Sequence, residues 1–317
     1  MSLNRRDFVK LCTGTVAGFG VSQMFHPAIR DALADTTSGA RPPVLWLAGQ
    51  SCTGCSVSLL NTTHPAIADV LLKVISLNYH STVMDAAGDL AVERIFDTAK
   101  THKGGFFVAV EGSVPTEAAG RYCVVGDYHH KEYTMADMLK EVTPDAAAVI
   151  AVGTCAAFGG IPAAKGSTTG AKSVSAFLKE HAIATPVVNL GGCPPHPDWI
   201  VGTIALALKL IQEKGLAEGH GEVVKALDAK GRPLPFYGEN VHEACPFLKA
   251  YADGNMCPTF TQKAGCRYAL GCKGPGAYCD SPKRKWNNGV NWCVANAVCI
   301  GCTGTDFPDG TSPFYSN

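Results

Sequence analysis

The distribution of cysteine constrains the fold of this chain more than any other feature of its sequence. Eight of the fourteen cysteines lie after residue 240, in a stretch that is rich in glycine and proline and has little hydrophobic periodicity. Such a stretch cannot build much apolar core, so it needs another source of order, and bound metal clusters can supply it. We therefore expect residues 216–317 to form an irregular domain organised around cysteine ligands.

The N-terminus has the pattern of an export signal. Arg5 and Arg6 in "NRRDFVK" form a twin-arginine pair, an apolar run follows, and the small-residue site "ALA" ends at Ala34. We predict that residues 1–34 are a signal peptide and that the protein is exported, already folded, to the periplasm by the twin-arginine pathway. Assembly in the reducing cytoplasm favours metal thiolates over disulfides.

Residues 35–215 alternate between short apolar runs and helical stretches. The predicted strands are residues 42–49, 70–80, 105–112, 146–153 and 185–192, and a long helix is expected to end at Gly215. Continuous apolar strands separated by helices indicate a parallel sheet that is covered on both faces. We expect an α/β domain with a flavodoxin-like, doubly wound parallel sheet, followed by the irregular domain.

Composition excludes several other classes. Positive and negative side chains balance, 27 against 27, so nothing overall favours binding to nucleic acid. No stretch has the eighteen uninterrupted apolar residues of a transmembrane helix. No glycine-rich nucleotide fingerprint indicates NAD or flavin, despite the flavodoxin-like pattern.

One group of cysteines follows three of the predicted strands. Cys52 and Cys55 come after the first strand, Cys155 follows the strand at 146–153, and Cys193 follows "VVNLGG". Loops at the carboxyl ends of parallel strands converge, so we expect these four thiols to meet at one edge of the sheet. Four thiolates suit a structural zinc or an iron–sulfur cluster, and the wide spacing of the last two favours the cluster.

Two further groups lie in the C-terminal region. "VHEACP" places His242 three residues before Cys245, and Cys266 and Cys272 follow downstream; this set could hold zinc or a cluster with one imidazole ligand. The other group has the spacing C-x13-C-x5-C-x2-C and consists of Cys279, Cys293, Cys299 and Cys302. Three groups exceed what one zinc or one redox disulfide needs, and several electron carriers in one chain would form an electron-transfer path.

The motifs "CTGC", "VEGSVP", "GTCAAFGG", "GCPPHPDW", "VHEACP", "LGCKGP", "CIGC" and "FPDG…SPFY" occur in this order along the chain. Together they resemble the small subunit of periplasmic nickel–iron hydrogenases, over essentially the whole predicted mature chain. The resemblance implies three iron–sulfur clusters. The proximal 4Fe–4S cluster would be held by Cys52, Cys55, Cys155 and Cys193. The distal 4Fe–4S cluster would be held by His242, Cys245, Cys266 and Cys272. The medial cluster would be held by Cys279, Cys299 and Cys302.

Cys293 decides the type of the medial cluster. Most of the family has proline at this position and a 3Fe–4S medial cluster, whereas "NWCVANAVC" is similar to the nickel–iron–selenium branch. A fourth thiolate allows a fourth iron and should lower the reduction potential. We expect Cys293 to be a ligand and all three clusters to be 4Fe–4S; if it is not a ligand, the medial cluster is 3Fe–4S. Cys123 and Cys257 match no ligand of the family.

The resemblance implies an electron-transfer subunit without catalytic residues of its own. Hydrogen would be split at the nickel–iron site of a large subunit, and electrons would pass to a soluble multihaem c-type cytochrome. Other interpretations are an iron–sulfur subunit of a different exported oxidoreductase, a disulfide-stapled secreted protein and a zinc-structured interaction subunit. A basic set near the later cysteines could steer a redox partner: Lys263, Arg267, Lys273, Lys283, Arg284 and Lys285.

Overall fold

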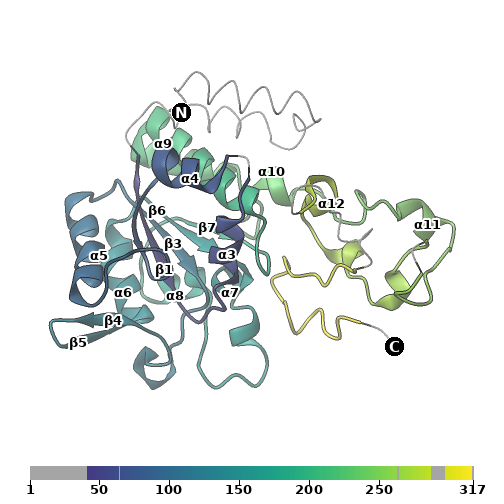
Figure 1. The fold of residues 1–317 in the computed structure, drawn as a ribbon, viewed down its shortest axis with the longest axis horizontal. Coiled ribbons are helices and arrows are strands. Elements are labelled where there is room, and N and C mark those ends of the chain that lie inside the picture. Colours follow the sequence, from purple (N-terminus) through teal and green to yellow (C-terminus); the bar gives the residue numbers. More distant parts are fainter. Residues whose placement is uncertain (1–40, 64, 263, 287–296, 316–317) are drawn as a thin grey trace.

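The structure is a computed structural model that describes residues 41–315 except residues 64, 263 and 287–296, and except the side chains of residues 208 and 210–220. A layered α/β region and an irregular C-terminal region lie next to each other (Figure 1). The final segment of the chain, in yellow, lies between the α/β region and the irregular region, and Cys302 in it is hydrogen-bonded to Thr154 of helix α7 (Figure 1). The predicted signal peptide lies outside the described residues.

A five-stranded parallel sheet forms the centre of the α/β region. Its strands are β1 (Pro43–Ala48), β2 (Ser76–His80), β3 (Phe107–Glu111), β6 (Ala148–Val152) and β7 (Val187–Leu190). They lie in the order β2-β1-β3-β6-β7, and every pair is parallel. This is the order of a flavodoxin-like doubly wound sheet, in which the chain switches direction at β1. The predicted fold class is confirmed.

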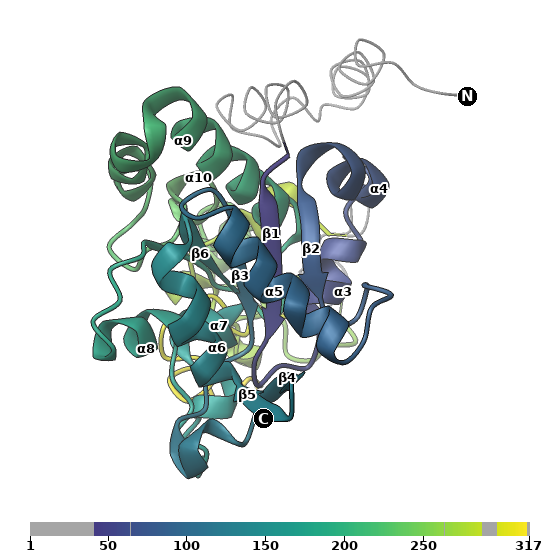
Figure 2. The same ribbon diagram turned by 90° about the vertical axis from the view of Figure 1, so that its left-hand side faces the viewer.

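Helices cover both faces of the sheet because successive strand residues point to opposite sides. On one face Trp46 and Ile150 pack with Trp199 of the long helix α9. On the other face Leu47 packs with Ile95. The first face is covered by α3 (Gly54–Leu60) and α9 (Pro197–Lys225), and the second by α5 (Asp89–Thr101), α6 (Met135–Val142) and α8 (Val174–Glu180) (Figure 2).

Three local features differ from the sequence predictions. The predicted second strand at 70–80 begins only at Ser76, because Val70–Val74 form a π-helical turn after the short α4 (Ile67–Asp69). A hairpin of β4 (Val124–Tyr128) and β5 (Lys131–Thr134) had not been predicted. Helix α9 continues to Lys225 and does not end at Gly215. The division of the chain into domains at residue 215 stays a prediction.

As far as the structure describes it, the C-terminal region contains only short helices. These are α10 (Leu234–Tyr237), α11 (Leu248–Ala252) and α12 (Ser281–Arg284), with single 3-10 turns at Tyr268–Leu270 and Gly274–Gly276. A separate core cluster has three buried residues, Cys257, Leu270 and Val298. The described part of this region therefore has little apolar core of its own. Among the described residues, no helix has the length and apolar character needed to cross a membrane.

Candidate metal centres

The proximal group consists of Cys52, Cys55, Cys155 and Cys193. Cys52 and Cys55 lie in the turn between β1 and α3, Cys155 lies in α7 (Thr154–Phe158) directly after β6, and Cys193 follows β7. The pKa of Cys55 is raised well above its ordinary value, first by burial and then by Glu111 and the other three thiols. The structure therefore brings the four predicted side chains together at the carboxyl edge of the sheet.

Glycines make room for these sulfur atoms. A Cβ at Gly153 would lie 2.5 Å from Cys55 Sγ, and one at Gly160 would lie 2.9 Å from Cys155 Sγ. Both glycines have positive φ, 89° and 53°, which favours glycine over other residues. Because glycine has no side chain, space is left beside the cysteine sulfurs. Four thiols around such a space fit a sulfur-ligated cluster.

A buried polar network beside Cys55 was missed by the sequence reasoning. Glu111, at the end of β3, is 1% exposed, and its Oε2 accepts hydrogen bonds from Trp46 Nε1 (3.1 Å), from the Ser56 amide (3.0 Å) and from the Ser56 hydroxyl. His80 Nε2 lies 3.1 Å from Ser56 Oγ, and its ring stacks on Trp46. The network fixes the start of α3, which carries Cys55. A charged residue ending a fully buried strand was the signal that could have revealed it.

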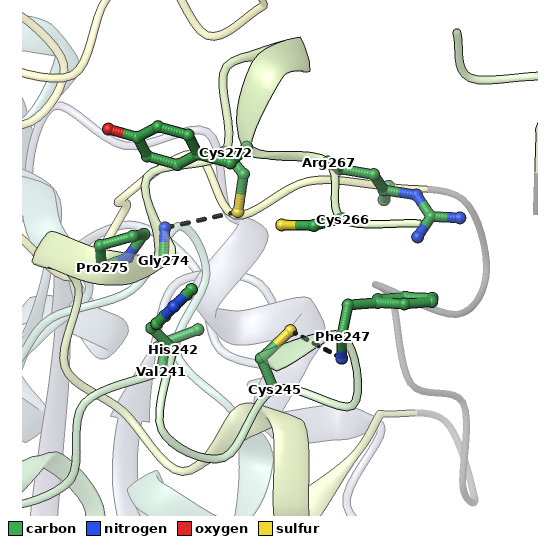
Figure 3. A pocket seen from close by; sticks show the side chains of 11 residues that line it. Val241, His242, Cys245, Phe247, Cys266, Arg267, Cys272, Gly274 and Pro275 are labelled. Atoms are coloured by element: carbon green, nitrogen blue, oxygen red, sulfur yellow. Dashed lines mark hydrogen bonds between the residues drawn. The ribbon is translucent and has the colours of Figure 1, made fainter. Parts of the chain in front are cut away.

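The distal group consists of His242, Cys245, Cys266 and Cys272, and its four side chains line one cavity (Figure 3). Backbone amides point at two of the sulfurs, from Phe247 to Cys245 Sγ (3.5 Å) and from Gly274 to Cys272 Sγ (3.4 Å). Amide donors of this kind stabilise a metal-bound thiolate. The His242 ring packs edge-on against Tyr251, with ring centroids 4.5 Å apart.

The medial group is described for Cys279, Cys299 and Cys302, whereas Cys293 lies outside the described residues. Burial raises the pKa of Cys279 to about 11 and that of Cys302 to about 12, and the Cys279 thiol adds to the rise at Cys302. Bare thiols in such a place stay protonated, whereas a bound cation favours the thiolate that coordinates it. In the described part of the chain, no three His, Cys, Asp or Glu side chains are spaced as ligands of a single ion.

The three groups lie in series. Cys302 of the medial group interacts electrostatically with Cys193 of the proximal group. At the other end Cys299 interacts with Cys272 of the distal group. The amide of Lys273, the next residue, donates to the Cys299 carbonyl at 2.7 Å. The medial group therefore lies between the other two.

The two remaining described cysteines lie outside these groups. Cys123 is half-buried, its Sγ lies 3.5 Å from the Ala48 carbonyl oxygen, and burial raises its pKa to about 11. Cys257 is fully buried, and its Sγ lies within hydrogen-bond distance of two carbonyl oxygens, those of Thr259 (3.1 Å) and Gln262 (3.2 Å). Both therefore lie in environments typical of unreactive thiols.

The predicted basic steering set needs correction. Arg267 and Arg284 are 3% and 5% exposed, so neither presents its charge at the surface. Arg267 stacks its guanidinium on the Phe247 ring, 4.5 Å from the centroid, and Arg284 pairs with Asp198 and Asp280. Lys263 lies outside the described residues.

Comparisons with known proteins agree along the chain. Residues 237–315 match the family model for the C-terminal part of the NiFe/NiFeSe hydrogenase small subunit, and residues 52–207 match that of the NADH ubiquinone oxidoreductase 20 kDa subunit. The periplasmic [NiFeSe] hydrogenase small subunit of Desulfomicrobium baculatum is 51% identical, over 99% of both chains. The periplasmic [NiFe] hydrogenase small subunit 1 of Nitratidesulfovibrio vulgaris is 40% identical, over 99% of this chain and 94% of the other.

Solved structures give the same result. A chain of the [NiFeSe] hydrogenase from Desulfovibrio vulgaris Hildenborough superposes with a TM-score of 0.87 at 62% identity, covering 89% of this chain and 99% of the other. A chain of the Ni-Fe-Se hydrogenase from Desulfomicrobium baculatum superposes with a TM-score of 0.81 at 51% identity, covering 87% and 99%.

Proposed function

This chain belongs to the family of NiFe/NiFeSe hydrogenase small subunits, and we propose that it carries electrons by means of three iron–sulfur clusters held by the proximal, medial and distal groups. It is the electron-transfer subunit of a heterodimeric hydrogenase, and it pairs with a large subunit that carries the site of hydrogen chemistry. The members of the family are iron–sulfur proteins.

The serial arrangement of the three cysteine groups is the observation that carries the proposal. A bound iron–sulfur cluster accepts and releases one electron at a time. The residues of this chain would hold such groups close enough for transfer. The Cys193 thiol interacts electrostatically with that of Cys302, and the Lys273 amide donates a hydrogen bond to the Cys299 carbonyl. Burial excludes water from Cys279 and Cys299, which are 6% and 9% exposed.

The proposed ligand sets are those that the resemblance implies. Cys52, Cys55, Cys155 and Cys193 would hold the proximal 4Fe–4S cluster. His242, Cys245, Cys266 and Cys272 would hold the distal one, and Cys279, Cys293, Cys299 and Cys302 the medial one. The gaps at Gly153 and Gly160 support the first set, and the amide donors to Cys245 and Cys272 support the second. For Cys293 the support is the sequence pattern and the identity to [NiFeSe] relatives.

Iron analysis with low-temperature EPR on the purified, mildly oxidised heterodimer tests this assignment. An oxidised 3Fe–4S cluster is paramagnetic, whereas ordinary oxidised 4Fe–4S clusters are silent. We expect iron for three clusters and no 3Fe signal, and we expect a Cys293→Pro variant to gain that signal. A full 3Fe signal in the unchanged protein would remove Cys293 from the ligands. Absence of iron would refute the electron-transfer proposal.

Relatives of this chain are named periplasmic, and we propose the same location, reached by the twin-arginine pathway. The support is the Arg5-Arg6 pair in the expected position. Replacing both arginines by lysine should leave the folded heterodimer in the cytoplasm, and continued export of that variant would contradict the route.

We also propose a soluble multihaem c-type cytochrome as the electron acceptor. The distal cavity supports the transfer of electrons to a partner at this site, because Tyr268, one of the residues that line it, is 49% exposed. Hydrogen-dependent reduction of a purified multihaem cytochrome by the heterodimer tests this, and a benzyl viologen assay run in parallel serves as control. Activity with the dye but none with the cytochrome would exclude this class of partner.

A further inference from the structure

One buried hydroxyl lies where the proximal and medial groups meet. Thr154 is the first residue of α7 and precedes the proximal residue Cys155; it is 1% exposed. Its Oγ1 accepts a hydrogen bond from the Gly192 amide at 2.7 Å and donates one to the carbonyl oxygen of Cys302. Thr154 therefore joins two proximal loops to a medial residue that lies 148 positions further along the chain.

The surrounding backbone closes this junction. The Thr154 amide donates to the Gly192 carbonyl at 2.9 Å, so Thr154 and Gly192 exchange two hydrogen bonds. The thiol of Cys193, the next residue, interacts electrostatically with that of Cys302. Cys302 is thus held by its carbonyl oxygen through Thr154, with its sulfur near that of Cys193.

The chemistry of the junction requires a hydroxyl. An amide donor and a carbonyl acceptor both need a partner, and a hydroxyl can accept from one while donating to the other. Valine has nearly the shape of threonine but leaves both buried groups without a partner, whereas serine can serve both. Thr154 is therefore the residue whose side-chain chemistry, and not its volume, holds Cys302 against the proximal loops.

We propose that Thr154 is a positioning residue for electron transfer between the proximal and medial sites. The rate of electron tunnelling falls much faster with distance across an empty gap than along covalent and hydrogen bonds. Holding Cys302 at its carbonyl keeps its sulfur near that of Cys193 and keeps the connection between the two ligand sets short. One electron is lost at the proximal site and one is gained at the medial site, and no covalent bond or proton changes place. The inference rests on the proposed ligand sets.

The test compares Thr154→Val with Thr154→Ser in the complete heterodimer. Two paramagnetic clusters split each other's EPR signals to an extent that depends on their separation and on the bonds between them, so the splitting between the proximal and medial signals reports how the two sites are held. We expect Thr154→Val to change this splitting and Thr154→Ser to keep it. Thr143→Val is the matched control, because Thr143 is fully buried and its hydroxyl donates to Leu139 O at 2.6 Å. That variant should keep the splitting.

Iron content separates failure of this inference from failure of the proposed function. If the unchanged heterodimer contains no clusters, the proposed function is wrong. If Thr154→Val contains full iron and unchanged splitting, the positioning role is wrong. Should the valine variant assemble poorly, Thr154→Ala repeats the test. Alanine removes the hydroxyl and puts no methyl group in its place. If both variants lack iron while the serine variant binds it, Thr154 is a folding residue and the inference is overturned.

Discussion

Replacing Arg284 by methionine should destabilise the junction between the α/β region and the cysteine-rich region. Arg284 Nη1 lies 3.0 Å from Asp198 Oδ2 at the start of α9, and its Nε lies 2.9 Å from Asp280 Oδ2, next to the medial residue Cys279. Burial alone would lower the pKa of Arg284, but the carboxylates of Asp280 and Asp198 raise it above its ordinary value.

The magnitude follows from burial. The side chains of Arg284 and Asp198 are 3% and 9% exposed, and removing one partner of a buried ion pair destabilises by about 3–5 kcal/mol. Most of that loss comes from the carboxylates that remain, because Asp198 and Asp280 would face each other without this cation. The triple variant Arg284→Met/Asp198→Asn/Asp280→Asn should therefore recover part of the stability, since it also removes the charges.

The assay is the temperature at which the anaerobic heterodimer loses its iron–sulfur absorbance, measured at one scan rate because such unfolding is irreversible. For a domain of this size the expected loss lowers that temperature by about 6–20 °C. Lys283→Met is the neighbouring control: Lys283 pairs with Glu239, the two side chains are 59% and 51% exposed, and such a pair contributes about 0–1 kcal/mol. Similar melting of the Arg284 and Lys283 variants would refute the reasoning.

Three further predictions follow from local geometry. The Gly153→Ala variant, whose Cβ would lie 2.5 Å from Cys55 Sγ, should lose the iron of one cluster. The control is Gly166→Ala, which has a similar positive φ and no atom within 4 Å, and it should keep all its iron. Full iron in both variants would contradict the role of Gly153 in leaving space for the cluster. Cys123 should resist iodoacetamide near pH 8 in the native heterodimer, because its raised pKa of about 11 leaves about one thiol in a thousand ionised; peptide mass spectrometry showing rapid labelling would disprove this. Burial lowers the pKa of His196 below its unfolded value of about 6.5, so its contribution to stability should be present above that pH and lost as the pH falls below it. Melting of the protein and of His196→Gln between about pH 7.5 and pH 5.5 checks this, and equal slopes would count against it.

Much of the fold could be predicted from the sequence because its signals are local. All five strands of the parallel sheet overlap the predicted runs, and β1, β3 and β6 are nearly continuous apolar runs because both of their faces are buried. The second strand was predicted too long, because Val70–Val74 are as apolar as a strand but form a helical turn. The β4–β5 hairpin was missed because its strands are largely exposed and carry no comparable apolar signal.

The candidate ligands could also be predicted from spacing, because sulfur and imidazole are among the few side chains that bind iron and because strand ends converge at one sheet edge. The burial of Arg267 and Arg284 could not, since a basic residue in a polar stretch is usually exposed. Glu111 likewise became meaningful only when Trp46 and Ser56 were found around its carboxylate.

The sequence by itself determined which chemistry this protein can hold: residue type and spacing along the chain define the cysteine groups and the strands that deliver the first of them. Only the tertiary structure decided how those groups connect. The hydrogen bonds from Thr154 to Cys302 and from Lys273 to Cys299 join residues far apart in the chain. Such contacts are set by the packing of α7 and the loop after β7 against the returning C-terminal segment, and no local pattern of residues encodes them.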